Sequence, residues 1–197
     1  MAHIDYYFTL LSPFTYLAGQ RLEGIAAKHG ASVTYKPFNL GEVGKETGFV
    51  PLAERAPARR AYRMQDLARI ADMTGLPINR EPAHWPMNPV PGTVAVIAAQ
   101  KVGGGDLGLL VHALLRSTWT NEKDIADGAV VRDCLKEAGF DPALADHDML
   151  GAIDTFERFT RDAIDAGVFG SPSYVVRDQL FWGQDRLDHL DRHLGQL

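Results

Sequence analysis

The chain has 197 residues, of which 46% are apolar and 23% are charged, as in an ordinary globular protein. Its net charge of −5 is spread over interleaved acidic and basic residues, which argues against a nucleic-acid partner. A single cysteine excludes an intrachain disulfide and a metal site built on several thiolates. The N-terminus lacks a basic leader, and no apolar run approaches the roughly 20 residues that span a bilayer. We therefore expect a cytoplasmic protein with no membrane partner.

The first forty residues are predicted to form a β-α-β unit. Residues 4–9 are rich in aromatic and β-branched side chains, which favour a buried strand. Ser12 and Pro13 are favoured at the start of a helix, and Gly30 is typical of a helix end. We expect one continuous helix between them, followed by a second strand over residues 32–38. A connection of this length suits a parallel crossover.

The middle of the chain is predicted to be helical. Residues 58–74 have a broad apolar face at helical spacing. The loop that follows, over residues 76–92, contains five prolines, and loops of this length inside a compact domain are usually functional. Further helices are expected over residues 93–102, 106–119, 129–138 and 150–166.

The end of the chain returns to strands. Residues 173–176 and 179–182 are short apolar runs separated by a turn, and a last amphipathic helix is expected to begin near Asp185. The order β-α-β, helices, β-β-α predicts an α/β protein with a thioredoxin-like fold and a large all-helical insertion.

The same order predicts two domains. Residues 1–39 and 167–197 would form the thioredoxin-like domain, and residues 40–166 the inserted helical domain.

Ser12 is the first candidate site residue. It follows a strand and precedes a helix, where the ligands of parallel sheets are bound. Free N–H groups and the helix dipole stabilise an anion there, and a thiolate is such an anion. A hydroxyl forms no disulfide, but it can donate a hydrogen bond to a sulfur that a ligand brings. The alternative is that Ser12 is an ordinary helix cap.

Two further segments could bind a peptide-like ligand. A cis bond between Ser171 and Pro172 would leave the Ser171 N–H and C=O free for such a ligand; the alternative is a plain trans turn. Downstream, Gly183 permits a close backbone approach. Asp185 could hold an ammonium and Arg186 a carboxylate, the charges of the γ-glutamyl end of glutathione. Alternatively, Asp185 caps the last helix.

Other candidates are weaker. His189 and His193 are four residues apart on the last helix, but no third ligand is evident, so we expect no metal. The lone Cys134 lies in a mostly apolar helical stretch and is interpreted as an inert core thiol.

Three segments resemble one known family. Residues 12–17, Ser-Pro-Phe-Thr-Tyr-Leu, resemble the start of kappa-class glutathione transferases and 2-hydroxychromene-2-carboxylate isomerases, members of the DsbA-like superfamily. Serine replaces the first cysteine of the redox relatives' Cys-x-x-Cys. Residues 167–173, Gly-Val-Phe-Gly-Ser-Pro-Ser, resemble the family's segment with a cis proline. Residues 181–186, Phe-Trp-Gly-Gln-Asp-Arg, resemble its glutathione contact. The resemblance covers nearly the whole chain.

The resemblance implies glutathione as the cofactor, with Ser12 hydrogen-bonded to its sulfur. Arg59 takes the place of a lysine that often contacts glutathione in the family. The implied glutathione contacts are Ser171, Pro172, Asp185, Arg186 and Arg59. The chain departs from the family at Gly48-Phe49, where members often carry Gly-Asn and the asparagine touches glutathione.

The resemblance also implies an activity. A glutathione-dependent isomerase would act on 2-hydroxychromene-2-carboxylate or a similar unsaturated aromatic acid by reversible addition of the thiolate. Trp85 and Asn88 of the proline-rich loop would bind this small-molecule substrate, and the enzyme is expected to be a homodimer. The alternatives are a kappa-like transferase or peroxidase, which consumes glutathione, and a non-catalytic thioredoxin-fold binding protein.

Overall fold

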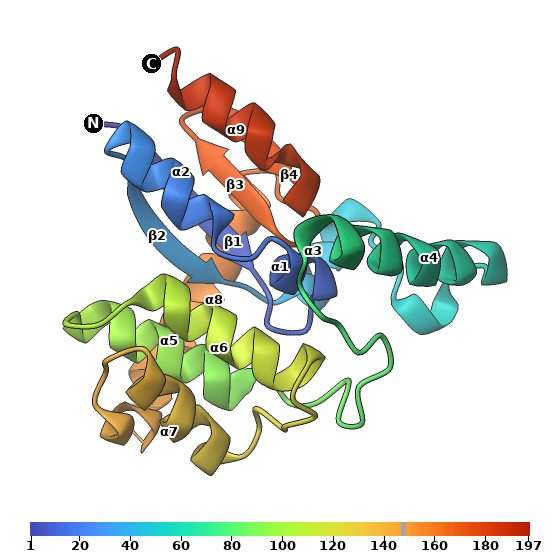
Figure 1. Ribbon diagram of the computed structural model, residues 1–197. Coiled ribbons are helices and arrows are strands. Elements are labelled where there is room, and N and C mark those ends of the chain that lie inside the picture. The colour runs from blue at the N-terminus through green and yellow to red at the C-terminus, as the bar shows by residue number, and fades with distance from the viewer. Residues whose placement is uncertain (147–148) are drawn as a thin grey trace.

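A four-stranded mixed sheet forms the centre of the protein, whose computed structural model describes residues 1–146 and 149–197. The strands run in the order β2-β1-β3-β4, with β1 parallel to β2 and the other neighbours antiparallel (Figure 1). This is the predicted thioredoxin-like sheet. The strands are β1 (His3–Phe8), β2 (Ser32–Pro37), β3 (Ser173–Val176) and β4 (Gln179–Trp182).

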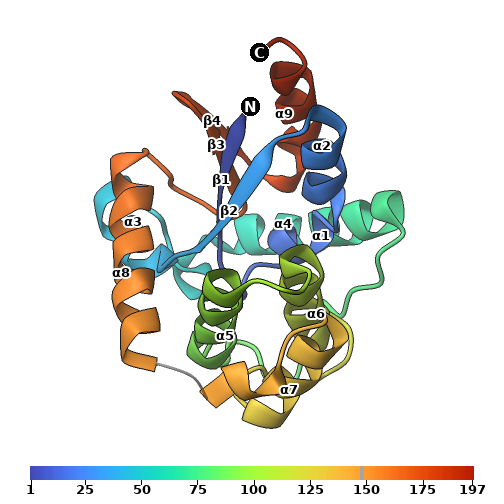
Figure 2. The same ribbon diagram turned by 90° about the vertical axis from the view of Figure 1, so that its left-hand side faces the viewer.

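Helices cover both faces of the sheet. Helices α2 and α9 lie on one face and α8 on the other, while α5, α6 and α7 pack together beyond the end of the sheet (Figure 2). The α-helices are α1 (Pro13–Leu17), α2 (Arg21–His29), α3 (Leu40–Thr47), α4 (Pro57–Thr74), α5 (Val90–Val102), α6 (Leu107–Trp119), α7 (Gly128–Glu137), α8 (Met149–Asp165) and α9 (Leu187–Leu194). Short 3-10 turns occur at Leu52–Glu54, Pro142–Asp146 and Gln184–Arg186.

Strand β1 is buried on both faces, as its apolar sequence predicts. Successive strand residues point to opposite faces. Tyr6 therefore stacks on Tyr174 at 5.2 Å between ring centroids, in the core cluster that α2 and α9 cover. Tyr7 lies in a second cluster with Phe38 and Val43, on the side of α8. The sheet is thus held between two apolar layers, which keeps the ends of its strands in fixed positions.

The predicted long first helix is wrong. The chain forms two helices, the five-residue α1 and the longer α2, because it turns at Gly19, whose φ is 60°. Glycine adopts this left-handed conformation without steric cost, so the turn is compatible with the sequence. Because of this turn, α1 has only five residues and is too short for a sizeable helix dipole.

Two helical segments were missed before α4, namely α3 and the turn over Leu52–Glu54. Asn39 begins α3 by accepting hydrogen bonds from the N–H groups of Gly41 and Glu42 through its side chain. Helix α5 also begins earlier than expected, inside the proline-rich loop, since Pro91 occupies its first turn, where proline is tolerated.

All four strands lie within residues 1–39 and 167–197, and the described part of residues 40–166 consists of helices and loops. The main core cluster nevertheless runs from the sheet into α4, α5 and α6. The two parts therefore share apolar core, and their division into two domains stays a prediction.

Glu23 of α2 is a carboxyl group enclosed where the sheet meets α6. Its Oε1 accepts a hydrogen bond of 2.7 Å from the Tyr35 hydroxyl, whereas its Oε2 is buried without a partner among the described residues. A side chain at Gly108 of α6 would collide with Glu23, because a Cβ there would lie 2.6 Å from the glutamate Cγ. Burial, and to a smaller degree the charge of Asp106, raises the pKa of Glu23 above its ordinary value of 4.5.

We expect Glu23 to make the protein less stable as the pH rises. A raised pKa in the folded state means that protonation of Glu23 favours folding. The stability that this protonation contributes is fully present below pH 4.5, the ordinary pKa, and is lost as the pH rises through the raised pKa of the folded state. Glu23→Gln lacks this titration. The unfolding free energy of wild type minus that of Glu23→Gln, from urea titrations at several pH values, should therefore fall as the pH rises above 4.5. A constant difference would contradict the expectation.

Candidate active site

Ser12 lies directly after β1 and is buried, with 8% of its surface exposed. Its Oγ accepts a hydrogen bond of 3.2 Å from the N–H of Thr15 and so caps α1, as predicted. The same hydroxyl donates a hydrogen bond of 3.2 Å to the backbone carbonyl of Ser171. Ser12 is therefore both a helix cap and a bridge to a segment 159 residues further along the chain.

Ser171 joins the two ends of the fold. Its Oγ accepts a hydrogen bond of 2.9 Å from the N–H of Thr9 and shares another of 2.9 Å with the Thr15 hydroxyl. The Ser171–Pro172 peptide bond is cis, as predicted. The expectation of a free Ser171 carbonyl is wrong, because Ser12 donates to it. We call the hydrogen-bonded group Thr9, Ser12, Thr15 and Ser171 the Ser171 junction.

A cavity of about 730 Å³ opens beside the Ser171 junction, at the carboxyl ends of β1 and β2, and we call it the arginine cavity. Its walls are mainly apolar and aromatic, and within the described residues its lining includes no aspartate or glutamate. The lining side chains used below are Ser12, Phe14, Phe49, Arg55, Arg59, Arg63, Trp85, Ser171 and Trp182.

Three arginines give this cavity its charge. Arg55 precedes α4, and Arg59 and Arg63 are four residues apart within it, so these two lie on one side of the helix. Burial, with the charge of Arg55 as the smaller cause, lowers the pKa of Arg63. Burial and the charge of Arg59 likewise lower the pKa of Arg55. The described part of the chain supplies no ion-pair partner to any of the three, so the cavity attracts anions.

A second cavity, of about 1090 Å³, lies on the other side of the Ser171 junction and contains Gly183, Asp185 and Arg186. Asp185 pairs with Arg186 at 2.8 Å, and their side chains are 57% and 47% exposed. The alternative role of Asp185 as a helix cap is wrong, since the cap residue of α9 is Arg186 and no side-chain hydrogen bond caps this helix. Both cavities are lined by Phe14, Ser171 and Trp182, so they share a wall and lie side by side in one candidate site.

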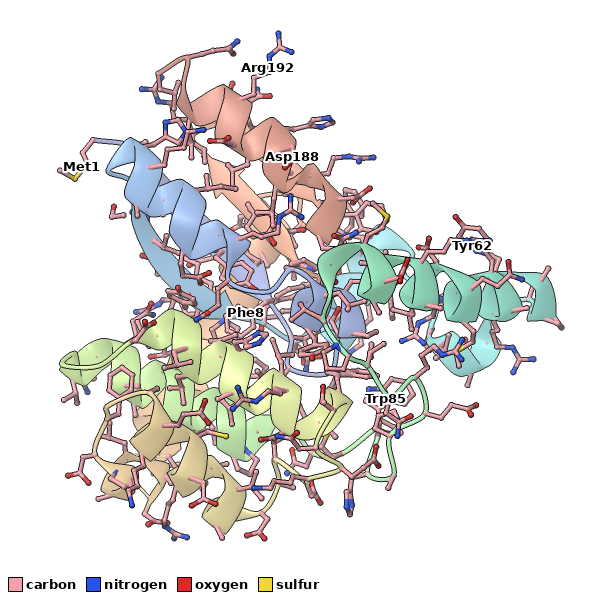
Figure 3. All side chains as sticks on the ribbon, viewed as in Figure 1. Met1, Phe8, Tyr62, Trp85, Asp188 and Arg192 are labelled. Carbon is pink, nitrogen blue, oxygen red and sulfur yellow. The ribbon has the colours of Figure 1, made fainter. Side chains whose placement is uncertain are left out.

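The proline-rich loop contributes one of its two predicted residues. Trp85 projects from the loop that follows α4 (Figure 3), lines the arginine cavity, and donates a hydrogen bond of 3.0 Å from Nε1 to the Leu11 carbonyl. Asn88 is exposed and lines neither cavity. Its Oδ1 accepts a hydrogen bond from the N–H of Val90 at the start of α5.

Several lining residues were not predicted from the sequence, and among them Arg55 and Arg63 carry charge. Their four-residue spacing around Arg59 was a usable signal. Phe49, which stands where the family often has asparagine, packs against Gly44 and lies 5.2 Å from the Arg55 guanidinium, ring centre to Cζ. No spacing in the sequence indicates that Phe14 and Trp182 line the wall that the two cavities share.

Two other properties bear on function. Among residues 1–146 and 149–197, no group of three histidine, cysteine or acidic residues is arranged to hold a metal ion. In the same residues, no helix combines the length and apolar character needed to cross a bilayer.

The sequence and the fold match known proteins along nearly the whole chain. The DsbA-like thioredoxin domain family matches residues 3–195. A 2-hydroxychromene-2-carboxylate isomerase of Sphingobium xenophagum is 31% identical over 194 residues, covering 97% of this chain and 97% of that protein. A solved structure of an isomerase of the same name has a TM-score of 0.79 and 25% identity, covering 98% of this chain and 95% of that one. Glutathione S-transferase kappa 1 of Caenorhabditis elegans is 36% identical over 83 residues, covering 42% of this chain and 36% of that protein.

We expect Gly170→Ala to displace Trp182 from the wall between the cavities, because an added Cβ would lie 2.7 Å from Cε2 of the indole. The substitution should lower the unfolding free energy by about 1–3 kcal/mol, the usual cost of overpacking. In a Trp182→Ala background the same change should cost little. Urea unfolding of the four proteins measures both losses, and equal losses in the two backgrounds would show that Trp182 is not the obstacle.

Proposed function

Because the chain belongs to the DsbA-like thioredoxin domain family, and within it to the family of 2-hydroxychromene-2-carboxylate isomerases, we propose that it is a glutathione-dependent isomerase of an unsaturated aromatic acid. The observation that carries this proposal is one cavity lined by both the Ser12 hydroxyl and three arginines, with aromatic walls between them. 2-Hydroxychromene-2-carboxylate, or a similar acid, has the flat apolar body and the negative charge that such a cavity suits.

The residues around the two cavities fit glutathione by their chemistry. Asp185 suits the ammonium of the γ-glutamyl end, and Arg186 and Arg59 suit its carboxylates. The backbone of Ser171 and Pro172 would lie along the peptide, with the Ser171 N–H as donor; the Ser171 carbonyl, which accepts one hydrogen bond from Ser12, can accept a second. Glutathione as the cofactor is also supported by the similarity to a relative that is named as a glutathione S-transferase.

Ser12 would act on the sulfur. When bound, glutathione supplies a thiolate that adds reversibly to the substrate's double bond, allows rotation, and leaves unconsumed. The Ser12 hydroxyl has one proton, now donated to the Ser171 carbonyl, and would turn it to the sulfur. The N–H of Thr15, which donates to the same oxygen, makes that hydroxyl a better donor. Hydrogen bonding to the charged form lowers a thiol pKa, and this effect replaces the helix dipole that the short α1 cannot supply.

The arginine cavity would hold the substrate. Phe14 and Trp85 would lie against its aromatic body, and the positive side of α4 would face its carboxylate. The exposed position of Asn88 gives no support to its predicted contact with substrate. The apolar walls also exclude water, which strengthens the electrostatic interactions inside.

A transferase that consumes glutathione is the second candidate, favoured by the local similarity to the kappa-class relative. The test follows the ultraviolet spectrum of 2-hydroxychromene-2-carboxylate together with the free thiol concentration. An isomerase changes the spectrum with catalytic glutathione and leaves the thiol concentration constant. Loss of thiol in step with substrate would establish a transferase or peroxidase, and no change in either would indicate a binding protein.

The homodimer is proposed on the resemblance, the two-domain division on the order of the predicted elements, and the cytoplasmic location on composition. Gel filtration with light scattering would test the assembly.

We expect Ser12→Ala to fold but to lose about ten- to a hundredfold in turnover, because a donor to a charged sulfur contributes roughly 1.5–3 kcal/mol. Loss of the cap and of the buried hydrogen bond to the Ser171 carbonyl should lower the unfolding free energy by about 1–3 kcal/mol. Thr15→Val is the matched control, because it removes a different hydrogen bond to Ser171 and leaves the Ser12 hydroxyl in place. It should retain most of the turnover, and wild-type turnover in Ser12→Ala would refute the role of Ser12.

Asp185→Asn and Arg186→Ala should raise the glutathione concentration needed for half-maximal rate by about two- to fivefold. The effect is small because both side chains are half exposed, and surface charge pairs contribute little. Their maximal rates should change less, since these contacts are remote from the sulfur. Asp178→Asn, in the turn between β3 and β4, is the control. If both variants instead lost maximal rate at unchanged glutathione dependence, the division of roles between Ser12 and this pair would be wrong.

A further inference from the structure

Two of the three arginines in the arginine cavity have no assigned role in binding glutathione. Arg59 is exposed at the edge of α4 and is the one proposed to contact glutathione, whereas Arg55 and Arg63 are half-buried. Removing a guanidinium from water is unfavourable unless an acceptor compensates it. Among the described residues, no carboxylate pairs with Arg55 or Arg63, and the one acceptor that they provide is the Val50 carbonyl at Arg55, so a bound anion would supply the missing countercharge.

The two guanidinium groups are held in position by aromatic rings. The Arg63 Cζ lies 6.0 Å from the ring centres of both Phe14 and Trp85, residues that line the arginine cavity. The Arg55 Cζ lies 5.2 Å from the Phe49 ring centre, and its Nε donates a hydrogen bond of 2.8 Å to the Val50 carbonyl. Such contacts fix the planar groups, which reduces the entropy lost when an anion binds.

The surroundings favour the carboxylate of an aromatic molecule over that of glutathione. Arg63 is next to Phe14 and Trp85, so an anion bound there has an apolar ring surface beside it. A flat acid places its ring against these side chains and its carboxylate against the guanidinium. A glycine carboxylate at the end of a flexible tripeptide would leave the ring surfaces uncovered.

We propose that Arg55 and Arg63 bind the carboxylate of the aromatic substrate and make the enzyme selective for acids over neutral analogues. This inference rests on the proposed function for the identity of the substrate. The binding of an aromatic carboxylate at these two arginines can be measured without any turnover.

The test uses calorimetry with trans-cinnamate and with the neutral trans-cinnamamide, without glutathione. Arg63→Gln and Arg55→Gln should each weaken cinnamate binding by about 10- to 100-fold, the range for a charge-assisted contact, and leave cinnamamide binding nearly unchanged. Arg60→Gln is the control, because Arg60 is exposed on the same helix and lines neither cavity. Arg63→Lys keeps the charge and should recover part of the cinnamate affinity.

Kinetic measurements then distinguish binding of the substrate carboxylate from binding of a glutathione carboxylate. The KM for the aromatic acid should rise in Arg63→Gln, while the glutathione dependence should stay as in wild type. A rise in glutathione dependence instead, or an equal loss of cinnamate and cinnamamide binding, would overturn the inference. So would a wild-type protein that does not bind cinnamate. If cinnamate binding needs both arginines but no isomerisation occurs, the inference stands and the proposed function fails.

Discussion

The Ser171 junction is the contact on which the rest of the site depends. The Ser171 hydroxyl binds the Thr9 N–H and the Thr15 hydroxyl, and its carbonyl accepts from Ser12. These groups are buried, so each unmade hydrogen bond would be costly. The junction therefore fixes the start of α1 against the turn before β3. Both cavities have Ser171 in their walls, and their common boundary follows from this one set of hydrogen bonds.

A second constraint is electrostatic. The arginine cavity brings together three like charges without an acidic partner in the described chain, an arrangement that does not stabilise the fold. Burial is the main cause that lowers the pKa of both Arg55 and Arg63, and a neighbouring arginine adds to it in each case, Arg59 for Arg55 and Arg55 for Arg63. Unfavourable charge of this kind is typical of binding sites, where a ligand provides the missing countercharge. Helix α4 extends from the side of the molecule (Figure 1). Its Arg59 and Arg63 line the arginine cavity, and neither is fully buried.

Local patterns in the sequence were sufficient for most elements. Both strands of the last hairpin were predicted with their observed bounds, because short apolar runs and the turn between them determine them locally. The break at Gly19 was missed because a glycine in a helical pattern is compatible with either a helix or a turn. Helix α3 was missed since its eight residues include two glycines and few apolar side chains.

The sequence by itself determined the fold class, the cap at Ser12, the cis bond before Pro172 and the family. Each depends on neighbouring residues or on motifs that keep their order along the chain. Only the tertiary structure decided that the Ser171 carbonyl is occupied, that Asn88 lies outside the cavities, and that Arg55 and Arg63 join Arg59 beside Phe14 and Trp85. The physical reason is that these contacts join segments far apart in the chain. Their geometry is set by packing of the sheet against the helices, which no local pattern records.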